Sequence, residues 1–341
     1  MNTPKLPVLI VGGGPVGLAL AAELGWQGIR CLLVEQGDGI VKTPKMNEVN
    51  TRSMEFCRRW GLADQVLDTP FPLDWPKDVV FVTSMSGYEL GRVARPPRRV
   101  RASEHSPEYT QTCSQHWFDP ILQRFARSFP HVTLRYRCRL DGLTQDAEGV
   151  TATLTDIESG TEERVEAQYL AGCDGAQSMV RRALGIALEG KGVLGCAVNM
   201  FFRTPDLLGV CGKKPGTFFV PVDRGGVWAN IRVIDPRQGL WRLMVNETNA
   251  ETRADAVDKD AYLRRGLRRH HAHPPSRPPG AILLALPLFQ RHGGMAPVPQ
   301  PAPVGFRLPA LLHHHVGDVL LCRAAARPRD GPRLRDDPAE A

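Results

Sequence analysis

Three glycines with the spacing GxGxxG, Gly12, Gly14 and Gly17, stand directly after an apolar run in the segment VLIVGGGPVGLAL. Ordered glycine costs conformational entropy, so a cluster of glycines in a folded segment needs a reason. In a dinucleotide-binding turn the first glycine allows the tight turn, the second lets the backbone approach a pyrophosphate, and the third lets helix and strand pack closely. Glu35 lies 23 residues past Gly12, where a carboxylate accepts ribose hydroxyls. These residues predict a dinucleotide site rather than an ordinary tight turn.

The elements that must position these residues form a strand, a glycine turn, a helix and a second strand. The apolar run Lys5–Val11 ends at the first glycine, a helical rhythm runs from Pro15 to Gln27, and the run Arg30–Glu35 ends at the carboxylate. This order predicts a βαβ unit of about 30 residues. The helix N-terminus of such a unit directs N–H groups and a positive dipole at the phosphates.

The second half of the chain has the pattern of a sheet. Residues 150–175 predict a hairpin that turns at Ser159 and Gly160 and continues into a strand ending at Cys173, Asp174 and Gly175. Further strand-like runs follow between residues 193 and 245, namely CAVNMFFRT, GTFFVPV, GVWANIRVI and GLWRLMV. Their β-branched and aromatic content predicts a mostly antiparallel sheet. The expected fold class is therefore α/β, or α+β overall.

The charge and cysteine content of the 341 residues exclude several classes of protein. The net charge is +7, but residues 266–341 carry ten arginines and five acidic residues, so the excess does not mark a basic face for nucleic acid. The eight cysteines stand singly, without CxxC, which argues against a zinc site and for reduced, mostly buried thiols. With no apolar run near 20 residues and no secretory pattern, we expect no membrane partner and a cytoplasmic protein. A homodimer is compatible with the sequence.

The composition changes from about Gly266. Residues 266–341 hold 13 of the 29 prolines and 7 of the 10 histidines, and they contain no Lys, Tyr, Trp or Asn. Proline at this density opposes both helix and sheet, so we expect an irregular tail. A disordered linker and translation out of frame are two alternatives for its origin. The histidines lack cysteine or carboxylate partners at ligand spacing, so no metal site is predicted.

Four segments together resemble the flavoprotein aromatic monooxygenases, the family of para-hydroxybenzoate hydroxylase, phenol hydroxylase and the polyketide hydroxylases. The resemblance extends from about residue 6 to residue 250. The glycine turn with Glu35 resembles the FAD-binding βαβ unit of that family. NTRSMEFCRRWGL resembles the helix whose arginine, here Arg52, reaches the cofactor, and CSQHWFDPIL resembles the helix in which Gln115 lies near the flavin nucleotide.

The fourth segment, YLAGCDGAQSMVRRALGI, resembles the Asp-Gly motif of the family, here Asp174 and Gly175 with Ser178 and Arg181. The resemblance implies that Asp174 contacts the FAD ribityl chain and that the motif helps to handle the nicotinamide cofactor. Taken singly, each position has a structural alternative. The arginines could be solvated surface charges, Gln115 a neighbour of a helix cap, and the Asp-Gly pair a turn.

The third FAD motif of the family, a Gly-Asp-Ala-Ala-His run near residues 320–335, has no match here. The chain has GDVLLCRAAARPRDGPRLRDD in that region, where residues 317–321 predict the strand that leads in. The expected segment would place an aspartate on the ribityl chain and backbone N–H groups beside the flavin ring. We therefore expect residues from about 266 onward not to form the closing FAD contact.

The resemblance implies an enzyme that hydroxylates a phenolic or other aromatic substrate with FAD, NADPH or NADH, and O2. The alternative is a catalytically impaired or inactive FAD-binding remnant. A third hypothesis is a reductase or halogenase on the same fold, but this chain lacks the Trp-rich segment that is typical of halogenases. The expected domains are a Rossmann-like FAD-binding domain over residues 1–185, with a substrate-domain hairpin at about 72–99, a substrate-binding sheet over 186–265, and the tail over 266–341. No catalytic residue is assigned.

Overall fold

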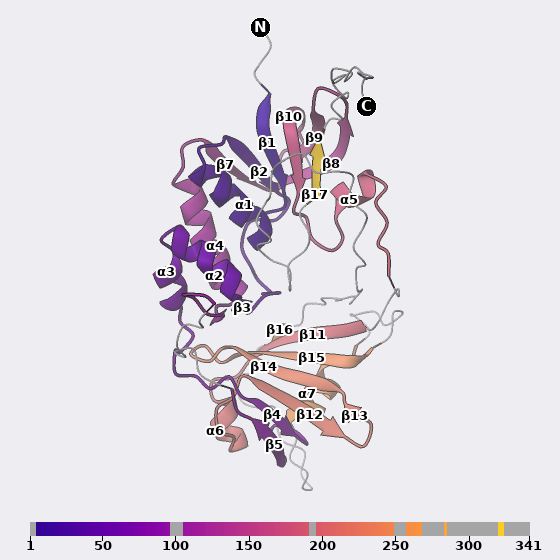
Figure 1. Cartoon of the computed structure of the whole chain (residues 1–341). Helices are drawn as coiled ribbons and strands as arrows, with labels where there is room; N and C mark the ends of the chain where they lie inside the picture. Colours follow the sequence, from indigo (N-terminus) through magenta and orange to yellow (C-terminus); the bar gives the residue numbers. More distant parts are fainter. Residues whose placement is uncertain are drawn as a thin grey trace, which may run out of the picture. The chain divides into compact units, whose positions relative to one another are not determined.

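The computed structural model describes residues 5–95, 105–190, 196–248 and 257–267, together with the backbone of two further strands at 283–284 and 320–323. The chain divides into two units. The first unit contains Met1–Gly39, Phe125–Ile186 and Gly317–Ala341, and the second contains Ile40–Arg124 and Ala187–Val316. Each unit has its own sheet (Figure 1).

The sheet of the first unit has the strand order β7-β2-β1-β10-β9-β8, and β17 pairs with β10. Strands β7, β2, β1 and β10 are parallel, whereas β9, β8 and β17 pair antiparallel. The strands are β1 (Leu6–Val11), β2 (Cys31–Glu35), β7 (Val132–Tyr136), β8 (Cys138–Gln145), β9 (Val150–Asp156), β10 (Glu162–Gly172) and β17 (Leu320–Arg323). The helices of this unit are α1 (Pro15–Trp26) and α5 (Met179–Ala183).

The parallel strands are apolar because both faces of this part of the sheet are covered. Leu9 and Ile10 of β1 and Leu33 of β2 are completely buried. Helix α1 contacts β1, β2 and β7, and most of its side chains are buried. Continuous apolar runs are typical of strands in such a covered parallel sheet. The βαβ order predicted for residues 5–35 is therefore confirmed.

The second unit is built around an eight-stranded sheet with the order β16-β11-β15-β14-β12-β4-β5, and β13 pairs with β12. Its strands are β4 (Val79–Val82), β5 (Glu89–Val93), β11 (Cys196–Arg203), β12 (Phe218–Asp223), β13 (Gly226–Val227), β14 (Ala229–Asp235), β15 (Leu240–Thr248) and β16 (Leu283–Leu284). A two-stranded sheet joins β3 (Glu48–Val49) to β6 (Gln111–Thr112). The helices are α2 (Thr51–Arg59), α3 (Ala63–Leu67), α6 (Leu207–Cys211) and α7 (Lys259–Leu267), and α4 (Gln115–Arg127) crosses the boundary between the units.

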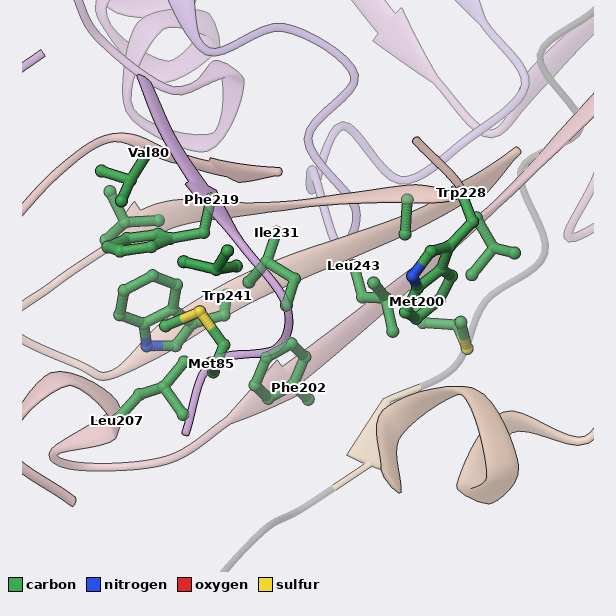
Figure 2. Packing of buried hydrophobic residues seen from close by; sticks show 14 of the residues in the cluster. Val80, Met85, Met200, Phe202, Leu207, Phe219, Trp228, Ile231, Trp241 and Leu243 are labelled. Atoms are coloured by element: carbon green, nitrogen blue, oxygen red, sulfur yellow. The ribbon is translucent and has the colours of Figure 1, made fainter. Parts of the chain in front are cut away.

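One face of this sheet forms the core of the second unit. Alternate residues of a strand point to the same face, and here they give a cluster that contains Met200, Phe219, Ile231, Trp241 and Leu243 (Figure 2). Side chains of α7 pack against the same cluster. Burial of these large side chains supplies the main stabilising force of the second unit.

The mixed fold class and the mostly antiparallel second sheet agree with the sequence prediction, but the division of the chain differs. Residues 40–124 belong to the second unit, whereas the prediction placed most of them in the FAD-binding domain. The hairpin β4–β5 joins the second sheet because β4 pairs with β12 in parallel. Because β4 and β12 are far apart in the sequence, no local pattern predicts that they pair. The functional labels of the two units stay predictions.

Most of the tail predicted for residues 266–341 lies outside the described residues. Helix α7 includes Gly266 and Leu267, so helix extends two residues into the predicted tail. The strand expected at 317–321 lies at Leu320–Arg323 and pairs antiparallel with the end of β10. The histidine clusters and the segment after β17 are not described.

The thiols of the described residues fit a structural role. Burial raises the pKa of Cys31, Cys57 and Cys173 to about 12, and a thiol with so high a pKa is a poor nucleophile. Among the residues that the structure describes, no helix is both long enough and apolar enough to cross a bilayer.

Phe219 tests the core of the second unit. Its side chain is completely buried, with its ring centroid 6.2 Å from that of Trp241. We expect Phe219→Ala to lower the free energy of unfolding by about 3–5 kcal/mol, because the change leaves a cavity in an apolar core. Leu90 is 56% exposed on β5 of the same sheet, so Leu90→Ala should cost less than about 0.5 kcal/mol. Urea unfolding followed by tryptophan fluorescence measures both, and equal losses would contradict this assignment of the core.

Candidate cofactor-binding site

The glycine turn joins β1 to the N-terminus of α1. The Gly12 N–H donates to the Val34 carbonyl at 2.8 Å, which ties the turn to β2. Helix α1 begins at Pro15, with Gly14 as its N-cap and no side chain capping it. The first N–H groups of a helix have no intrahelical acceptors, so an uncapped N-terminus offers donors and a positive dipole to an anion.

The three glycines of the GxGxxG pattern are required for different reasons. Gly12 has a φ of +110°, and a Cβ there would lie 2.4 Å from the Cys173 carbonyl oxygen. A Cβ on Gly17 would lie 1.9 Å from the Gly12 carbonyl oxygen. Both positions are therefore glycine because the backbones of β1, α1 and β10 approach closely.

Gly14 has no such packing reason. Its backbone is extended, with φ −77° and ψ −178°, a conformation open to any residue. A Cβ built on Gly14 meets no atom of the described protein within 4 Å. The space over Gly14 is thus left open at the helix N-terminus, where the GxGxxG pattern brings a pyrophosphate to the backbone.

Glu35 closes the site at the end of β2. Its Oε2 accepts the Gly13 N–H at 2.6 Å, and its Oε1 accepts the Gly37 N–H at 2.7 Å. These two bonds hold the carboxylate beside the glycine turn. A carboxylate has about four acceptor positions, so both oxygens can still accept ribose hydroxyls. The sequence did not identify Gly13 and Gly37 as the donors, although Gly13 lies between Gly12 and Gly14 and Gly37 lies two residues after Glu35.

Asp174 and Gly175 follow β10 and lie beside the same turn. The Cys173 N–H donates to the Val11 carbonyl at 2.7 Å, so the ends of β10 and β1 are held together. Asp174 accepts hydrogen bonds from the Ser178 hydroxyl at 2.5 Å and from the backbone N–H of Met179 at 2.6 Å. The carboxylate therefore stabilises the start of α5. A contact between Asp174 and the ribityl chain stays a prediction.

The remaining residues of the Asp-Gly motif also have partners within the motif. The Ser178 hydroxyl accepts the Arg181 N–H at 2.9 Å, and the Arg181 guanidinium donates to the Ile186 carbonyl at 2.8 Å. Gly175 has a φ of +77°, as a tight turn requires. These bonds agree with the structural alternative for this segment, and a role toward a nicotinamide cofactor stays a prediction.

Arg52 lies on the first turn of α2 in the second unit. Its guanidinium pairs with Glu55 at 2.5 Å and stands over the ring of Phe56 at 4.8 Å. The bond from Arg52 holds the pKa of the Glu55 carboxyl below its usual range. The Arg52 side chain is 57% exposed, so it can release Glu55 for a stronger anionic partner at little cost.

Gln115 is buried at the start of α4 in the same unit. Its Oε1 accepts the Lys45 N–H at 2.9 Å, and its Nε2 donates to Asp119 Oδ2 at 3.0 Å. The neighbouring Ser114 hydroxyl bonds Asn47 Oδ1 at 3.1 Å. Gln115 therefore fixes the segment before β3 against α4, a connection of 70 residues that no local pattern reveals.

The structure brings six of the eight predicted cofactor residues to one edge of the first sheet. They lie after the carboxyl ends of the neighbouring parallel strands β2, β1 and β10, and they are Gly12, Gly14, Gly17, Glu35, Asp174 and Gly175. Arg52 and Gln115 belong to the second unit. The arrangement in the first unit can bind a phosphate at a helix N-terminus and a ribose at a carboxylate.

Comparison with known proteins adds a family to this geometry. The chain matches the model of the FAD binding domain family over residues 5–281. It is 34% identical over 217 residues to tetracenomycin B2 monooxygenase-dioxygenase of Streptomyces olivaceus, covering 60% of this chain and 40% of the relative. It is 32% identical over 222 residues to 2,4-dichlorophenol 6-monooxygenase of Delftia acidovorans, covering 64% of this chain and 38% of the relative.

A comparison with solved structures also finds a monooxygenase. The flavin-dependent monooxygenase PieE, in complex with FAD and substrate, superposes with a TM-score of 0.71 at 27% identity and covers 86% of this chain and 51% of PieE. The chain thus spans about two fifths of the length of the two curated relatives and half that of PieE.

The contrast between Gly14 and Gly17 predicts two different defects. Gly14→Val should leave the thermal unfolding temperature close to that of the parent but abolish FAD binding, because the new side chain fills only the open space over the turn. Gly17→Val should lower the unfolding temperature, because its Cβ would overlap the Gly12 carbonyl. Flavin absorbance after gel filtration and differential scanning fluorimetry measure the two properties. A Gly14→Val protein that retained flavin like the parent would show that the turn is not the cofactor site.

Removal of the Glu35 side chain should lower the affinity for the cofactor more than it lowers the stability of the fold. We expect Glu35→Ala to weaken FAD binding by about 1–3 kcal/mol, the scale of a lost hydrogen bond to a charged group. Loss of the acceptor for the Gly13 and Gly37 N–H groups should also loosen the turn. Glu23 lies near the other end of α1, where its Oε1 accepts a hydrogen bond from Gln27 Nε2 at 3.2 Å, and Glu23→Ala supplies the control variant. An FAD titration unchanged in Glu35→Ala would contradict the role in ribose binding.

Proposed function

The chain belongs to the family of FAD-dependent aromatic monooxygenases, and we propose that it hydroxylates a phenolic or other aromatic substrate with FAD, NADPH or NADH, and O2. FAD, when bound, supplies the redox chemistry that links the nicotinamide cofactor to oxygen. The residues of the chain then have three tasks: they bind the cofactor, orient the aromatic ring, and exclude water from the reaction. This chain spans only part of the length of its relatives, so hydroxylation by this chain is itself part of the proposal.

The observation that carries the proposal is the open space over Gly14 between an uncapped helix N-terminus and the fixed Glu35 carboxylate. Gly12 and Gly17 are explained by packing within the protein, but Gly14 is not. A glycine without a packing reason, at the position where a pyrophosphate approaches, fits a dinucleotide. In the proposal, the pyrophosphate binds the N-terminus of α1 and Glu35 accepts the hydroxyls of the adenosine ribose.

The roles of the remaining predicted residues extend this proposal. Asp174 and Gly175 lie beside the glycine turn, which supports a role for them at the ribityl chain. Arg52 is exposed and held by a surface ion pair that a phosphate or flavin oxygen could replace. Gln115 is bonded within its unit, and its role is to shape the backbone from Lys45 to Asn47 for the flavin nucleotide. The second sheet forms the wall of the substrate site.

The inactive remnant has no support in the comparisons, since the relatives are named as monooxygenases. The proposal also includes the use of NADPH or NADH, a homodimeric state and a cytoplasmic location. The buried, high-pKa thiols support a reducing compartment.

We expect the purified chain to be yellow, or to become yellow on incubation with FAD, and to oxidise NADH or NADPH faster when a phenol is present. Oxygen uptake, hydrogen peroxide release and mass spectrometry of the product, with 2,4-dichlorophenol as a first probe, measure the coupling. A product heavier than the probe by one oxygen atom supports hydroxylation. The Gly14→Val variant is the matched control, because it should fold but lack flavin.

Two outcomes would contradict the proposal. A chain that binds no FAD at any concentration is not a flavoprotein. A chain that binds FAD, but converts all NAD(P)H oxidation into hydrogen peroxide with every phenol tried, is not a hydroxylase. The second outcome is expected if the closing FAD contact is missing, because the site would then admit water.

A further inference from the structure

Arg137 forms the corner between β7 and β8, and its backbone is left-handed, with a φ of +53°. Within the part of the chain that the structure describes, every other residue with a positive φ is glycine. A Cβ atom in this conformation lies too close to the following carbonyl, so glycine is the usual residue there and asparagine or aspartate the next. An arginine in this conformation is strained, and such strain persists only where the surrounding structure fixes the backbone.

Two backbone hydrogen bonds fix the Arg137 corner. The Arg137 N–H donates to the Gly37 carbonyl at 2.9 Å, and the Arg137 carbonyl accepts the Ile157 N–H at 2.8 Å. Gly37 lies two residues after β2, and Ile157 directly follows β9. The corner therefore connects the parallel part of the first sheet, to which β2 belongs, with the antiparallel part, to which β9 belongs.

The bond to Gly37 connects the corner to the Glu35 carboxylate. Gly37 accepts the Arg137 N–H through its carbonyl and donates its own N–H to Glu35 Oε1 at 2.7 Å. A Cβ on Gly37 would lie only 3.1 Å from that oxygen. Because the Gly13 N–H binds the other oxygen at 2.6 Å, the orientation of the carboxylate depends on two donors. Arg137 fixes the position of one of them.

The neighbouring residue Tyr136 supports the same segment. Tyr136 is in register with Glu35 in the pairing of β7 with β2. Gly39 has a φ of +79°, and a Cβ there would lie 2.6 Å from Tyr136 Cε1. The segment after Glu35 thus contacts the end of β7 at two points, through the hydrogen bond to Gly37 and through the close approach of the Tyr136 ring to Gly39.

The side chain of Arg137 does not account for the left-handed conformation. Its Nε lies 3.1 Å from an Oε1 of Glu158, and the two side chains are 53% and 68% exposed. Ion pairs with this exposure contribute little to stability. The backbone bonds to Gly37 and Ile157 are therefore the contacts that fix the corner.

We propose that Arg137 is a positioning residue for the cofactor: its left-handed corner holds Gly37, and Gly37 holds the Glu35 carboxylate toward the adenosine ribose. The inference rests on the proposed function, since it takes Glu35 as the acceptor of the ribose hydroxyls. A carboxylate that is already oriented loses less freedom when a ligand binds. Displacement of Gly37 should therefore weaken the binding of the ribose hydroxyls and leave the phosphate contacts at the glycine turn unchanged.

The test compares ADP with 2′,3′-dideoxy-ADP, which has the same base and phosphates but no ribose hydroxyls. Isothermal titration calorimetry on the full, flavin-free chain measures both affinities. We expect the parent to bind ADP at least about 10-fold more tightly than the dideoxy nucleotide, the scale of a hydrogen bond to a charged group. Valine strongly disfavours a positive φ, so Arg137→Val should lower the ADP affinity by roughly 3- to 10-fold and leave the dideoxy-ADP affinity unchanged.

Glycine and asparagine at the corner provide the rescue. Both residues accept the left-handed conformation, so Arg137→Gly and Arg137→Asn should keep the ADP preference of the parent although the arginine side chain is gone. Gly37→Ala tests the same connection from its other end. Its Cβ would crowd Glu35 Oε1, so the preference for ADP should fall by about 3-fold, on the scale of a weakened hydrogen bond.

Two control variants separate the corner from its surroundings. Arg139→Val makes the same change two residues further on, within β8, where a β-branched side chain suits the extended backbone. Glu158→Ala removes the ion pair of Arg137 and leaves the corner intact. Both variants should keep the ADP preference and the ADP affinity of the parent.

A double-mutant cycle identifies the carboxylate through which the corner acts. In a Glu35→Ala chain, Arg137→Val should cause no further loss of ADP affinity, because the residue that it positions is absent. A purely structural role of Arg137 would instead lower the affinities for ADP and dideoxy-ADP together, in both backgrounds.

Several results would overturn the inference. They are an ADP preference that survives in Arg137→Val, equal losses for both nucleotides, loss of the preference in Arg137→Gly, or an Arg137→Val protein that fails to fold, which would assign the corner to the fold alone. The hydroxylation assay separates this inference from the proposed function. A parent that hydroxylates a phenol but has no Arg137-dependent ADP preference contradicts only the inference. A parent with that preference that forms no hydroxylated product contradicts only the proposed function.

Discussion

The close approach of three backbones at the glycine turn is the constraint on which the candidate cofactor site depends. The Gly12 carbonyl lies where a Cβ of Gly17 would be, and the Cys173 carbonyl lies where a Cβ of Gly12 would be. Strand β1, helix α1 and the end of β10 can therefore meet only if both positions lack side chains. Their meeting brings an uncapped helix N-terminus, the Glu35 carboxylate and the Asp174 segment to one edge of the sheet. The anion-binding character of that edge follows from the packing.

In both units, some positions are explained by contacts within the protein and others are not. This difference separates structural positions from candidate functional positions. Gly12 and Gly17 are explained by contacts, whereas Gly14 is not. Arg92 is saturated with carboxylates and carbonyls, whereas Arg232 and Arg242 have buried nitrogen atoms that form no hydrogen bond with the described residues. Native proteins satisfy most buried polar groups. Positions that break this rule are candidates for ligand contacts, and the open space over Gly14 in the first unit agrees with a dinucleotide at the turn.

The two faces of the second sheet have opposite effects on the stability of the unit. One face holds the apolar cluster around Phe219 and Trp241, which stabilises the unit. The other face carries the opposed Arg232 and Arg242, and burial of their charges with few acceptors costs stability. Because side chains alternate along each strand, the two faces share the same strands. The apolar face can therefore support a charged face that would not be stable alone, and the paired strands hold the two arginines in register.

The sequence by itself was sufficient for features that depend on local spacing. The GxGxxG pattern with Glu35 indicated the βαβ unit and its cofactor, and the β-branched and aromatic runs over residues 193–245 indicated the antiparallel strands, because both signals are visible within a few residues. Only the tertiary structure showed that residues 40–124 join the second unit, that Gln115 bonds Lys45, and that Arg232 and Arg242, ten residues apart in the chain, face each other. Pairing partners and register depend on contacts between distant segments. Local patterns contain no information on those contacts, so only the folded chain determined which glycine serves packing and which arginines face each other across the sheet.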